Sequence, residues 1–342
     1  MITTVGSGAP SPSRDRLGSV ISARLEAWGG AELPLERLTF GTTEPDAIAA
    51  AIDAWCATFL GAGIAHYHFF DSSSGSVHGV RLRDGRDVVV KVHRPDLTLA
   101  YLDAISTVQR AFAEHGLPAP RPLTGPVPYG PVHITAETLL ASGPPADGHD
   151  PAVRAALARG LVRVVVVGRA LQLVGTDALH HPTAMPPDAL YPPPHSARFD
   201  FEATAAGAEW IDEYARRARA ALAAGDPGPD VLVHGDWSIE NANVAAGEVV
   251  AIYDWDSVCV EPELFAVATA AVTFCVDWLR PVGEHFPTNA EICAFIGEYE
   301  TARGAQFSDA QRGLLAARIV YGLCYGARCE HADNFPEVAE AA

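Results

Sequence analysis

The sequence predicts an α+β protein of two lobes, a small N-terminal lobe with an antiparallel β-sheet and a larger, mainly helical C-terminal lobe. Two β-branched segments, Val77 to Arg83 and Val88 to His93, are joined by Asp84-Gly85, which is typical of a tight hairpin. Beyond residue 150 the pattern becomes mostly helical, after a Gly-Pro-Pro linker. We therefore expect a flexible N-terminal tail, an N-terminal lobe and a C-terminal lobe at residues 1–15, 16–138 and 139–342.

The N-terminal lobe is expected to combine a helix, the small sheet, a second helix and an exit strand. The first helix begins near Thr43, whose hydroxyl can cap it, and one face is apolar at Ile48, Ile52, Trp55 and Phe59. The second helix runs from about Leu97 to His115 and ends at Gly116. Val132 to Leu139 predicts the strand that leaves the lobe.

The C-terminal lobe is expected to contain long helices and two short apolar strands. A segment with six prolines, His181 to His195, interrupts the helical pattern and predicts a loop. The strands are Val231 to Val233 and Val249 to Tyr253. The helices are expected at Ala152 to Val174, Ala203 to Ala224 and Ala310 to Cys329.

Charge and composition exclude several classes of protein. The formal net charge is −18, which argues against a nucleic-acid partner and favours a cationic ligand, although the acids also fit a merely solvated surface. Six scattered cysteines without a CxxC pair predict neither a zinc site nor a disulfide framework, which fits reduced thiols in a cytoplasm. The longest apolar run, Leu264 to Val276, is shorter than the ~20 residues of a membrane span, and we expect no membrane partner and no signal peptide.

The strongest signal is the run His234 to Asp236 followed by Asn241, directly after the strand at Val231 to Val233. The second strand ends at Asp254. An Asp and an Asn five residues apart on a loop, with another Asp 13 residues later, suit phosphoryl transfer. One carboxylate orients the proton of an attacking hydroxyl, while the amide and the other carboxylate supply the hard oxygen ligands that Mg²⁺ prefers.

This His-Gly-Asp-x-x-x-x-Asn run, followed by Asp-Trp-Asp at 254–256, resembles the signature of the aminoglycoside phosphotransferase and choline kinase superfamily, small-molecule kinases with a protein-kinase-like fold. The resemblance covers roughly residues 40 to 330. It implies that ATP and Mg²⁺ are the cofactors. It also implies that Asp236 is the catalytic base and that Asn241 and Asp254 are the metal ligands.

The same resemblance assigns a nucleotide site in the N-terminal lobe. Lys91 lies in an apolar strand, where a buried ammonium is costly unless it meets an anion, and it would hold the α- and β-phosphates. Ser74, Gly75 and Ser76 lie between two strands, where the family has a phosphate loop of small residues, and their hydroxyls and backbone N–H groups would cradle phosphates. Glu137 falls where the hinge that reads the adenine base would lie.

The sequence departs from the family pattern in two places. The family has a Glu on the helix after the lysine strand, whereas the corresponding stretch, Tyr101 to Arg110, has Asp103 as its only acid. Lys91 is therefore expected to pair with Asp103, or with nothing until ATP arrives. The family's acid after the metal loop is also missing, because this chain has Leu264 to Ala268 there.

Further residues are candidates for a substrate pocket. Trp237 lies inside the catalytic loop and is the tryptophan most expected in an aromatic wall; Trp210, Trp255 and Trp278 are more often core residues. Four acids follow the metal loop and fit either a cationic pocket or a solvated face: Glu261, Glu263, Asp277 and Glu284.

The function predicted from these observations is transfer of the ATP γ-phosphate to a hydroxyl of a small, cationic, aminated acceptor, such as an aminoglycoside-type antibiotic. This version would give antibiotic resistance. A metabolic kinase of an amino sugar or amino alcohol fits the same residues. A pseudokinase-like module that binds nucleotide without turnover is the alternative from another class, favoured by the missing helix Glu and disfavoured by the intact catalytic residues.

Overall fold

The structure is a computed structural model, and it divides by its contacts into two units. Unit 1 comprises Met1–Pro95 and Val127–Leu139, and unit 2 comprises Asp96–Pro126 and Leu140–Ala342. The structure describes residues 17–28, 33–72, 75–141, 143–172, 179, 189–194, 199–277 and 285–335. The expected N-terminal tail and most of the proline-rich segment 181–195 lie outside these ranges. The lobe bounds drawn from the sequence stay a prediction.

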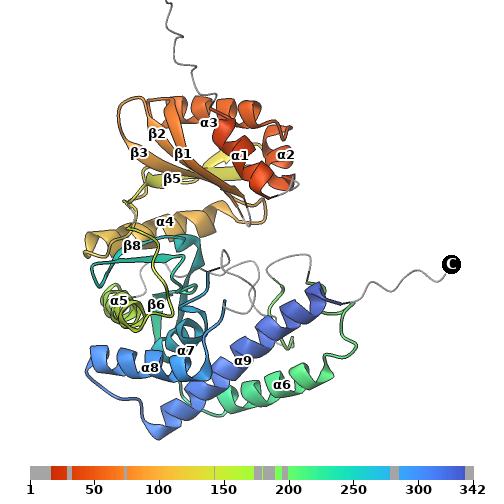
Figure 1. Cartoon of the computed structure of the whole chain (residues 1–342), viewed down its shortest axis with the longest axis vertical. Helices are drawn as coiled ribbons and strands as arrows, with labels where there is room; N and C mark the ends of the chain where they lie inside the picture. Colours follow the sequence, from red (N-terminus) through yellow and green to blue (C-terminus); the bar gives the residue numbers. More distant parts are fainter. Residues whose placement is uncertain are drawn as a thin grey trace, which may run out of the picture. The chain divides into compact units, whose positions relative to one another are not determined.

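Unit 1 is built on a five-stranded antiparallel sheet with the strand order β1-β2-β3-β5-β4 (Figure 1). The predicted hairpin joins β2 to β3 and turns at Gly85, whose φ of 89° lies in the left-handed region that glycine tolerates. The strands are β1 (Ile64–Ser72), β2 (Ser76–Leu82), β3 (Asp87–Val92), β4 (Val127–Tyr129) and β5 (Val132–Thr138).

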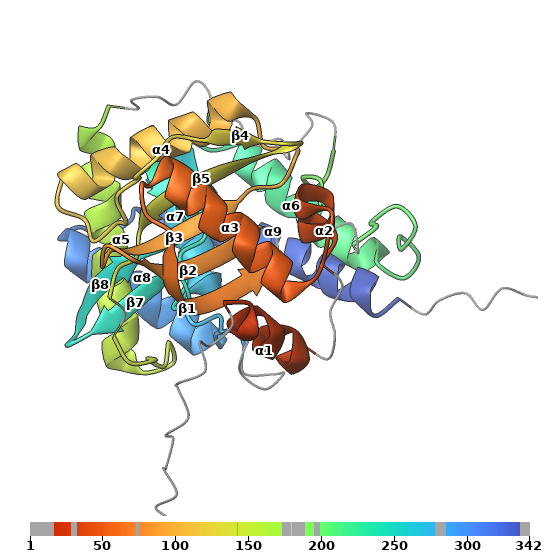
Figure 2. The same ribbon diagram turned by 90° about the horizontal axis from the view of Figure 1, so that it is seen from above.

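Three helices cover one face of this sheet: α1 (Ser19–Ala27), α2 (Pro34–Phe40) and α3 (Pro45–Phe59). In Figure 2, α3 crosses the strands β1 to β3. Alternate residues of β3, among them Val88 and Val90, enter the core that α3 closes, so Val89 and Lys91 lie on the opposite face. The expected cap at Thr43 is wrong, because Glu44 precedes the helix and no side chain caps it.

A buried polar network crosses the core of unit 1. The His78 ring is fully buried on β2, with Nδ1 at 3.4 Å from the Tyr67 hydroxyl and Nε2 at 3.0 Å from Ser76 Oγ. Burial lowers the pKa of His78 to about 3. Burial also raises the pKa of Tyr67. Both groups are therefore neutral at pH 7, and the histidine joins two strands by accepting one hydrogen bond and donating the other.

Unit 2 combines six α-helices of the described residues with two small antiparallel sheets, β6–β9 and β7–β8. The strands are β6 (Asp230–His234), β7 (Ala242–Ala245), β8 (Glu248–Ile252) and β9 (Val258–Pro262), with the 3₁₀ turn η2 (Trp255–Ser257) between β8 and β9. The helices are α4 (Leu99–Glu114), α5 (Pro151–Ala170), α6 (Glu209–Ala223), α7 (Glu263–Thr273), α8 (Asn289–Arg303) and α9 (Asp309–Asp333). The predicted antiparallel sheet and helical C-terminal region are thus confirmed.

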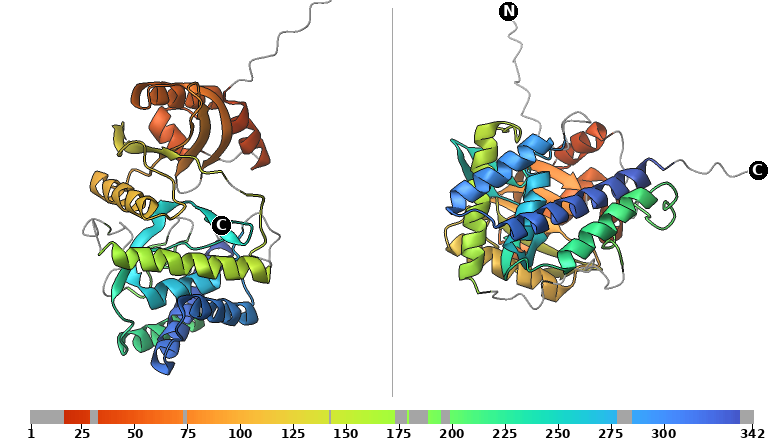
Figure 3. Two further views of the ribbon diagram at one scale, coloured as in Figure 1. Left: turned by 90° about the vertical axis from the view of Figure 1, so that its left-hand side faces the viewer. Right: turned by 90° about the horizontal axis from the view of Figure 1, so that it is seen from below.

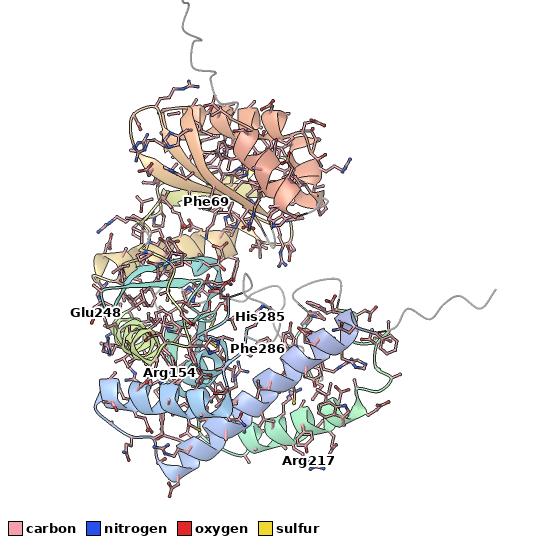
Figure 4. All side chains as sticks on the ribbon, in the orientation of Figure 1. Phe69, Arg154, Arg217, Glu248, His285 and Phe286 are labelled. Atoms are coloured by element: carbon pink, nitrogen blue, oxygen red, sulfur yellow. The ribbon has the colours of Figure 1, made fainter. Side chains whose placement is uncertain are left out.

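Helix α5 packs closely on β6, the strand that precedes Asp236 and Asn241. A Cβ added at Gly168 would lie 1.9 Å from the carbonyl oxygen of Leu232 on β6, so only glycine permits this approach. Near the N-terminal end of α5, Arg154, which is labelled in Figure 4, forms a bidentate ion pair with Glu298 of α8, with its guanidinium nitrogens 2.9 to 3.2 Å from the carboxylate oxygens. Close packing thus holds β6 to α5, and the ion pair holds α8 to the same helix.

Helices α6 and α9 run side by side (Figure 3). Arg328 of α9 is buried and donates hydrogen bonds to the carbonyl oxygens of Phe201 and Thr204, which fixes the segment before α6. The sequence predicted this helix from Ala203, but it begins at Glu209. The Asp200 carboxylate accepts from the backbone N–H groups of residues 202 and 203 and forms a separate turn there.

Within the described part of the chain, the helices are too short or too polar to cross a lipid bilayer.

We expect His78 to make stability depend on pH. Its pKa is about 3 when folded, against an ordinary value of 6.5 for histidine, so the unfolded chain takes up a proton that the folded chain cannot. Stability is therefore lost as the pH falls from about 7 toward 3, by about 2 kcal/mol between pH 7 and pH 5. Chemical unfolding of wild type and His78→Gln at both pH values measures this difference. Between pH 7 and pH 5, the free energy of unfolding should fall by about 2 kcal/mol less in the variant than in the wild type. His66→Gln, at an exposed position of β1, is the control. An equal pH dependence in wild type and His78→Gln would contradict the assignment.

Candidate active site

The motif residues lie on the loop between β6 and β7. Asp236 is exposed, and the Asn241 side-chain nitrogen donates to its backbone oxygen at 3.0 Å and to its Oδ2 at 2.8 Å. The structure therefore brings the predicted base and one predicted metal ligand into direct contact. Because the amide nitrogen is used on Asp236, the amide oxygen of Asn241 is the atom left for a cation.

His234 joins this loop to the end of β8. Its Nε2 donates to the carbonyl oxygen of Tyr253 at 2.7 Å, and its Nδ1 accepts from the backbone N–H of Asp236 at 3.3 Å. These two contacts assign the ring proton to Nε2. The ring is 2% exposed and lies edge-on to Trp255. One buried imidazole thus fixes the backbone next to Asp236 and the backbone next to Asp254.

Asp254 occupies a strained backbone conformation. Its φ of 55° and ψ of 49° lie in the left-handed region, which costs a residue with a Cβ about 1–2 kcal/mol. Its carbonyl oxygen accepts from the hydroxyl of Ser257 at 2.8 Å, which closes the turn η2. The strain projects an exposed carboxylate from the end of a buried strand, as backbone strain often does at functional sites.

Gly235 is required by a close approach of two chain segments. Its N–H donates to the carbonyl oxygen of Ser257 at 3.0 Å, and an added Cβ would lie 2.6 Å from that same oxygen. A side chain at this position would therefore push β6 away from the η2 turn. The sequence assigned Gly235 only a role in loop shape, and the contact with Ser257 gives that role its physical cause.

The expectation of an aromatic wall at Trp237 is wrong. Trp237 is 1% exposed, and its indole N–H donates to the carbonyl oxygen of Leu157 on α5 at 3.2 Å. The Thr273 hydroxyl donates to the backbone oxygen of Trp237 at 3.0 Å. Trp237 is therefore the buried support of the loop. Trp210 is exposed on α6, Trp255 is buried, and Trp278 lies outside the described residues.

Helix α4 supports the turn that follows Asp254, which the sequence did not predict. The Tyr101 hydroxyl donates to the carbonyl oxygen of Asp256 at 3.1 Å, and the Phe112 ring lies 4.9 Å from the Trp255 ring. Both side chains project from the face of α4 that enters the core of unit 2. The sequence predicted a helix from about Leu97 to His115, but nothing in it identified the surface on which this helix would pack.

In unit 1, Lys91 pairs with a carboxylate on the neighbouring strand. Its Nζ lies 3.7 Å from Oε1 of Glu137, and both side chains are 9% exposed. This corrects the expectation that Lys91 has no acid until ATP arrives, and Asp103, its other expected partner, is exposed on α4. The strand register explains the pairing, because Lys91 is opposite Thr135 and Glu137 follows two residues later on the same face. A contribution of Glu137 to nucleotide binding stays a prediction.

The predicted phosphate loop is described only in part, since Ser74 lies outside the described residues. Ser76 differs from the expectation, because its side chain is buried and its hydroxyl contacts His78 inside the core. The alternation of β2 directs this side chain into the core, so its hydroxyl does not serve a phosphate outside it. Gly75 lies close to the end of β3, where an added Cβ would be 3.3 Å from the carbonyl oxygen of Val92.

Two of the acids expected near a cationic pocket have structural partners instead. Glu263 begins α7 and is bonded to Arg169 of α5 and to the Tyr299 hydroxyl of α8. Glu261 faces Arg318 of α9 at 3.8 Å. Burial raises the pKa of Glu261. Asp277 is half-buried, and Glu284 lies outside the described residues.

The donor set fits a hard divalent cation in chemistry. Asn241 and Asp254 offer an amide oxygen and a carboxylate, and the exposed Asp236 carboxylate lies beside Asn241. Sulfur and imidazole ligands, which softer metals prefer, are not part of this set. No cluster of three His, Cys, Asp or Glu side chains that could hold a metal occurs among the described residues.

Comparison with known proteins identifies the family. The family model described as "Phosphotransferase enzyme family" matches residues 72–304, more than half of the chain. The chain therefore belongs to the phosphotransferase enzyme family. A search of the curated proteins finds no match.

Solved structures show the same fold at low sequence identity. The amicoumacin kinase hAmiN, in complex with AMP-PNP, Ca²⁺ and Ami, has a TM-score of 0.54 and 13% identity, covering 79% of this chain and 89% of its own. Macrolide 2'-phosphotransferase MphH from Brachybacterium faecium, an apoenzyme, has a TM-score of 0.51 and 17% identity, covering 84% and 99%. A thermostable mutant of aminoglycoside phosphotransferase APH(4)-Ia, with AMP-PNP and hygromycin B, has a TM-score of 0.51 and 15% identity, covering 83% and 98%. The predicted kinase-like fold is confirmed.

We expect Gly235→Ala to lower the free energy of unfolding by about 1–3 kcal/mol, because the new methyl group meets a backbone oxygen that cannot turn away. Gly313→Ala is the matched control. This exposed helical glycine of α9 has nothing within 4 Å of its added Cβ, so alanine there should raise stability by up to about 1 kcal/mol. Denaturant unfolding measures both. Equal stabilities of the two variants would mean that the approach of β6 to η2 is not tight.

Proposed function

We propose that this enzyme transfers the γ-phosphate of Mg-ATP to a hydroxyl of a small, cationic, aminated acceptor. The observation that carries the proposal is the contact of Asp236 with Asn241 at 2.8 Å on an exposed loop, held to the Asp254 turn by His234. Such a loop offers one carboxylate for the acceptor and two oxygen ligands for a cation. Phosphoryl transfer depends on this kind of positioning more than on covalent chemistry by the protein.

The residues of unit 2 have distinct roles in this proposal. Asp236 orients the acceptor hydroxyl and takes up its proton, and Asn241 holds the Asp236 carboxylate in place through its amide nitrogen. Asn241 and Asp254 hold Mg²⁺ through their side-chain oxygens. Bound Mg²⁺ offsets the negative charge that develops on the phosphates.

The residues of unit 1 hold the nucleotide. Lys91 binds the α- and β-phosphates, and Glu137 keeps the ammonium group in position beside β5. Gly75 and the backbone N–H groups around it contact phosphate oxygens. Lys91 has a carboxylate partner in Glu137 although the following helix has no Glu. The missing helix Glu is therefore no longer a reason to prefer a module that binds nucleotide without turnover.

The chain's charge supports a cationic acceptor. The chain has 42 acidic and 24 basic residues, and a negative field raises the local concentration of protonated amines. Two structural relatives bind small molecules besides a nucleotide analogue. The aminoglycoside phosphotransferase APH(4)-Ia mutant is in complex with hygromycin B, and the amicoumacin kinase hAmiN is in complex with Ami. An antibiotic acceptor in a cytoplasm, with resistance as the result, is the version that we propose. A metabolic kinase of an amino sugar or amino alcohol is distinguished from it only by the acceptor.

The proposal is tested by ATP consumption with a panel of aminoglycosides, other antibiotics, amino sugars and choline-like alcohols. Product mass identifies the phosphorylated acceptor. For a cationic acceptor, the KM should rise with salt at saturating ATP, because attraction between exposed charges is screened within ~8–10 Å at 0.1–0.15 M ionic strength. A neutral sugar as best acceptor, or a KM independent of salt, would contradict the cationic acceptor. No turnover with any acceptor would favour the binding module.

We expect Asp236→Asn and Asp254→Ala to separate transfer from binding. Asp236→Asn should reduce kcat by ~10²–10⁴-fold and leave the affinity for Mg-ATP nearly unchanged, because only proton uptake and hydroxyl orientation are lost. Asp254→Ala should weaken Mg-ATP binding itself, since a metal ligand is removed. Calorimetry with Mg-ATP and the rate with the best acceptor measure the two effects. If Asp236→Asn keeps more than about a tenth of kcat, Asp236 is not the base.

A further inference from the structure

Tyr253 lies between the end of β8 and Asp254, and both polar groups of its backbone are hydrogen-bonded. Its N–H donates to the carbonyl oxygen of Asn241 at 2.7 Å, and its carbonyl oxygen accepts from Nε2 of His234 at 2.7 Å. One residue thus holds both proposed metal ligands, Asn241 through a backbone hydrogen bond and Asp254 through the chain itself. The position of each ligand therefore depends on where Tyr253 lies.

The side chain of Tyr253 holds the residue from a third direction. Its hydroxyl donates to the carbonyl oxygen of Leu140 at 3.2 Å, and Leu140 is the first residue of unit 2 after unit 1 ends at Leu139. Burial raises the pKa of Tyr253, so the hydroxyl keeps its proton at pH 7 and stays a donor. The three hydrogen bonds of Tyr253 therefore reach parts of unit 2 that are far apart in the sequence.

The segment after β5, which contains Leu140 and Gly143, has a second attachment of its own. The N–H of Gly143 donates to Oδ1 of Asn243 on β7 at 2.7 Å, and an added Cβ at Gly143 would lie 2.9 Å from the Cβ of Ala245. This hydrogen bond and this close packing do not involve Tyr253. Loss of the Tyr253 hydroxyl should therefore release the tyrosine and leave the segment in place.

The anchoring of Tyr253 matters because the next residue is strained. Asp254 has a φ of 55°, in the left-handed region, and such a conformation persists where the surrounding structure holds it. The hydroxyl of Ser257 bonds the carbonyl oxygen of Asp254 at 2.8 Å on the C-terminal side. The hydrogen bonds of Tyr253 hold the N-terminal side. Loosening Tyr253 should therefore change the direction of the Asp254 carboxylate relative to Asn241.

Cations differ in their sensitivity to such a change. Mg²⁺ requires nearly ideal octahedral geometry at about 2.0–2.1 Å, whereas Ca²⁺ accepts oxygen ligands at about 2.3–2.6 Å in flexible arrangements. A small shift between Asn241 and Asp254 should therefore weaken the binding of Mg²⁺ more than the binding of Ca²⁺.

We propose that Tyr253 is a positioning residue that favours Mg²⁺ over Ca²⁺ by fixing the placement of Asn241 and Asp254. This inference rests on the proposed function, because it takes these two residues as the metal ligands. The Tyr253 hydroxyl acts through the backbone of residues 253 and 254, and its anchor is the carbonyl oxygen of Leu140. Its removal should therefore lower the affinity for nucleotide with Mg²⁺ and spare the affinity without metal.

The test measures nucleotide affinity with each cation. Calorimetry gives the affinity of the full-length protein for the ATP analogue AMP-PNP with Mg²⁺, with Ca²⁺ and with a chelator. The gain from a cation is the ratio of the affinity with it to the affinity without metal. In Tyr253→Phe, which keeps the ring, the gain from Mg²⁺ should fall by about three- to ten-fold, the size of one net hydrogen bond. The gain from Ca²⁺ and the metal-free affinity should each change by less than about two-fold.

Two further variants separate positioning from a general loss of stability. Tyr321→Phe is the matched control, because the Tyr321 hydroxyl on α9 donates to the carbonyl oxygen of Leu190 at 2.9 Å and burial raises its pKa as well. This variant should lower the free energy of unfolding, as Tyr253→Phe does, and leave the gain from Mg²⁺ unchanged. Asp254→Ala should lose most of that gain. Adding Tyr253→Phe to Asp254→Ala should have little further effect, because the positioned ligand is absent.

Four outcomes overturn the proposal. A wild-type gain from Mg²⁺ in Tyr253→Phe rejects this inference and leaves the proposed function intact. Equal losses with Mg²⁺, with Ca²⁺ and without metal show a general disturbance of the nucleotide site. An equal loss of the Mg²⁺ gain in Tyr321→Phe shows that lower stability is a sufficient cause. If the wild type gains no affinity from either cation, the metal role of Asn241 and Asp254 in the proposed function fails, and this inference fails with it.

Discussion

The arrangement of the catalytic unit depends on the buried imidazole of His234. Its two nitrogens bond the backbone beside Asp236 and the backbone beside Asp254, which lie on loops that follow different strands. A buried group bonded at both ends cannot shift without leaving a polar atom unsatisfied, so the two loops keep their register. Gly235 permits the close approach at Ser257, and Trp237 and Trp255 fill the space below. The exposed carboxylates of Asp236 and Asp254 are thus positioned by the buried residues around them.

Unit 1 also contains a buried histidine whose two ring nitrogens are both hydrogen-bonded. The neutral His78 joins Tyr67 of β1 to Ser76 at the start of β2 and so fixes the first residues of β2. On the opposite face, the Lys91–Glu137 ion pair is formed between neighbouring strands. Both side chains project from strands of one sheet, so strand register alone brings this carboxylate to the ammonium group of Lys91. The two faces thus separate the buried hydrogen bonds of His78 from the Lys91–Glu137 ion pair.

The sequence predicted those features of the fold that depend on neighbouring residues, and it missed features that depend on contacts between residues far apart in the chain. The hairpin at Asp84-Gly85 and the strands before Asp236 and Asp254 follow from local pattern, and the structure has them. The start of α6 was misplaced because the Asp200 side chain forms a turn that competes with the helix. Helices α1 and α2 and strand β9 were not predicted, since their short segments are stabilised by packing and pairing with distant parts of the chain.

The sequence by itself determined the fold class and the resemblance to the family, and it supplied the candidate catalytic motif, because the spacing of Asp236, Asn241 and Asp254 is a local property of two strand ends. Only the tertiary structure decided the partners of these residues. Strand register gave Lys91 its acid on β5, alternation buried the Ser76 hydroxyl, and close packing made Trp237 a core residue. Register and packing join residues far apart in the chain, and a single sequence does not specify which of several compatible partners they meet.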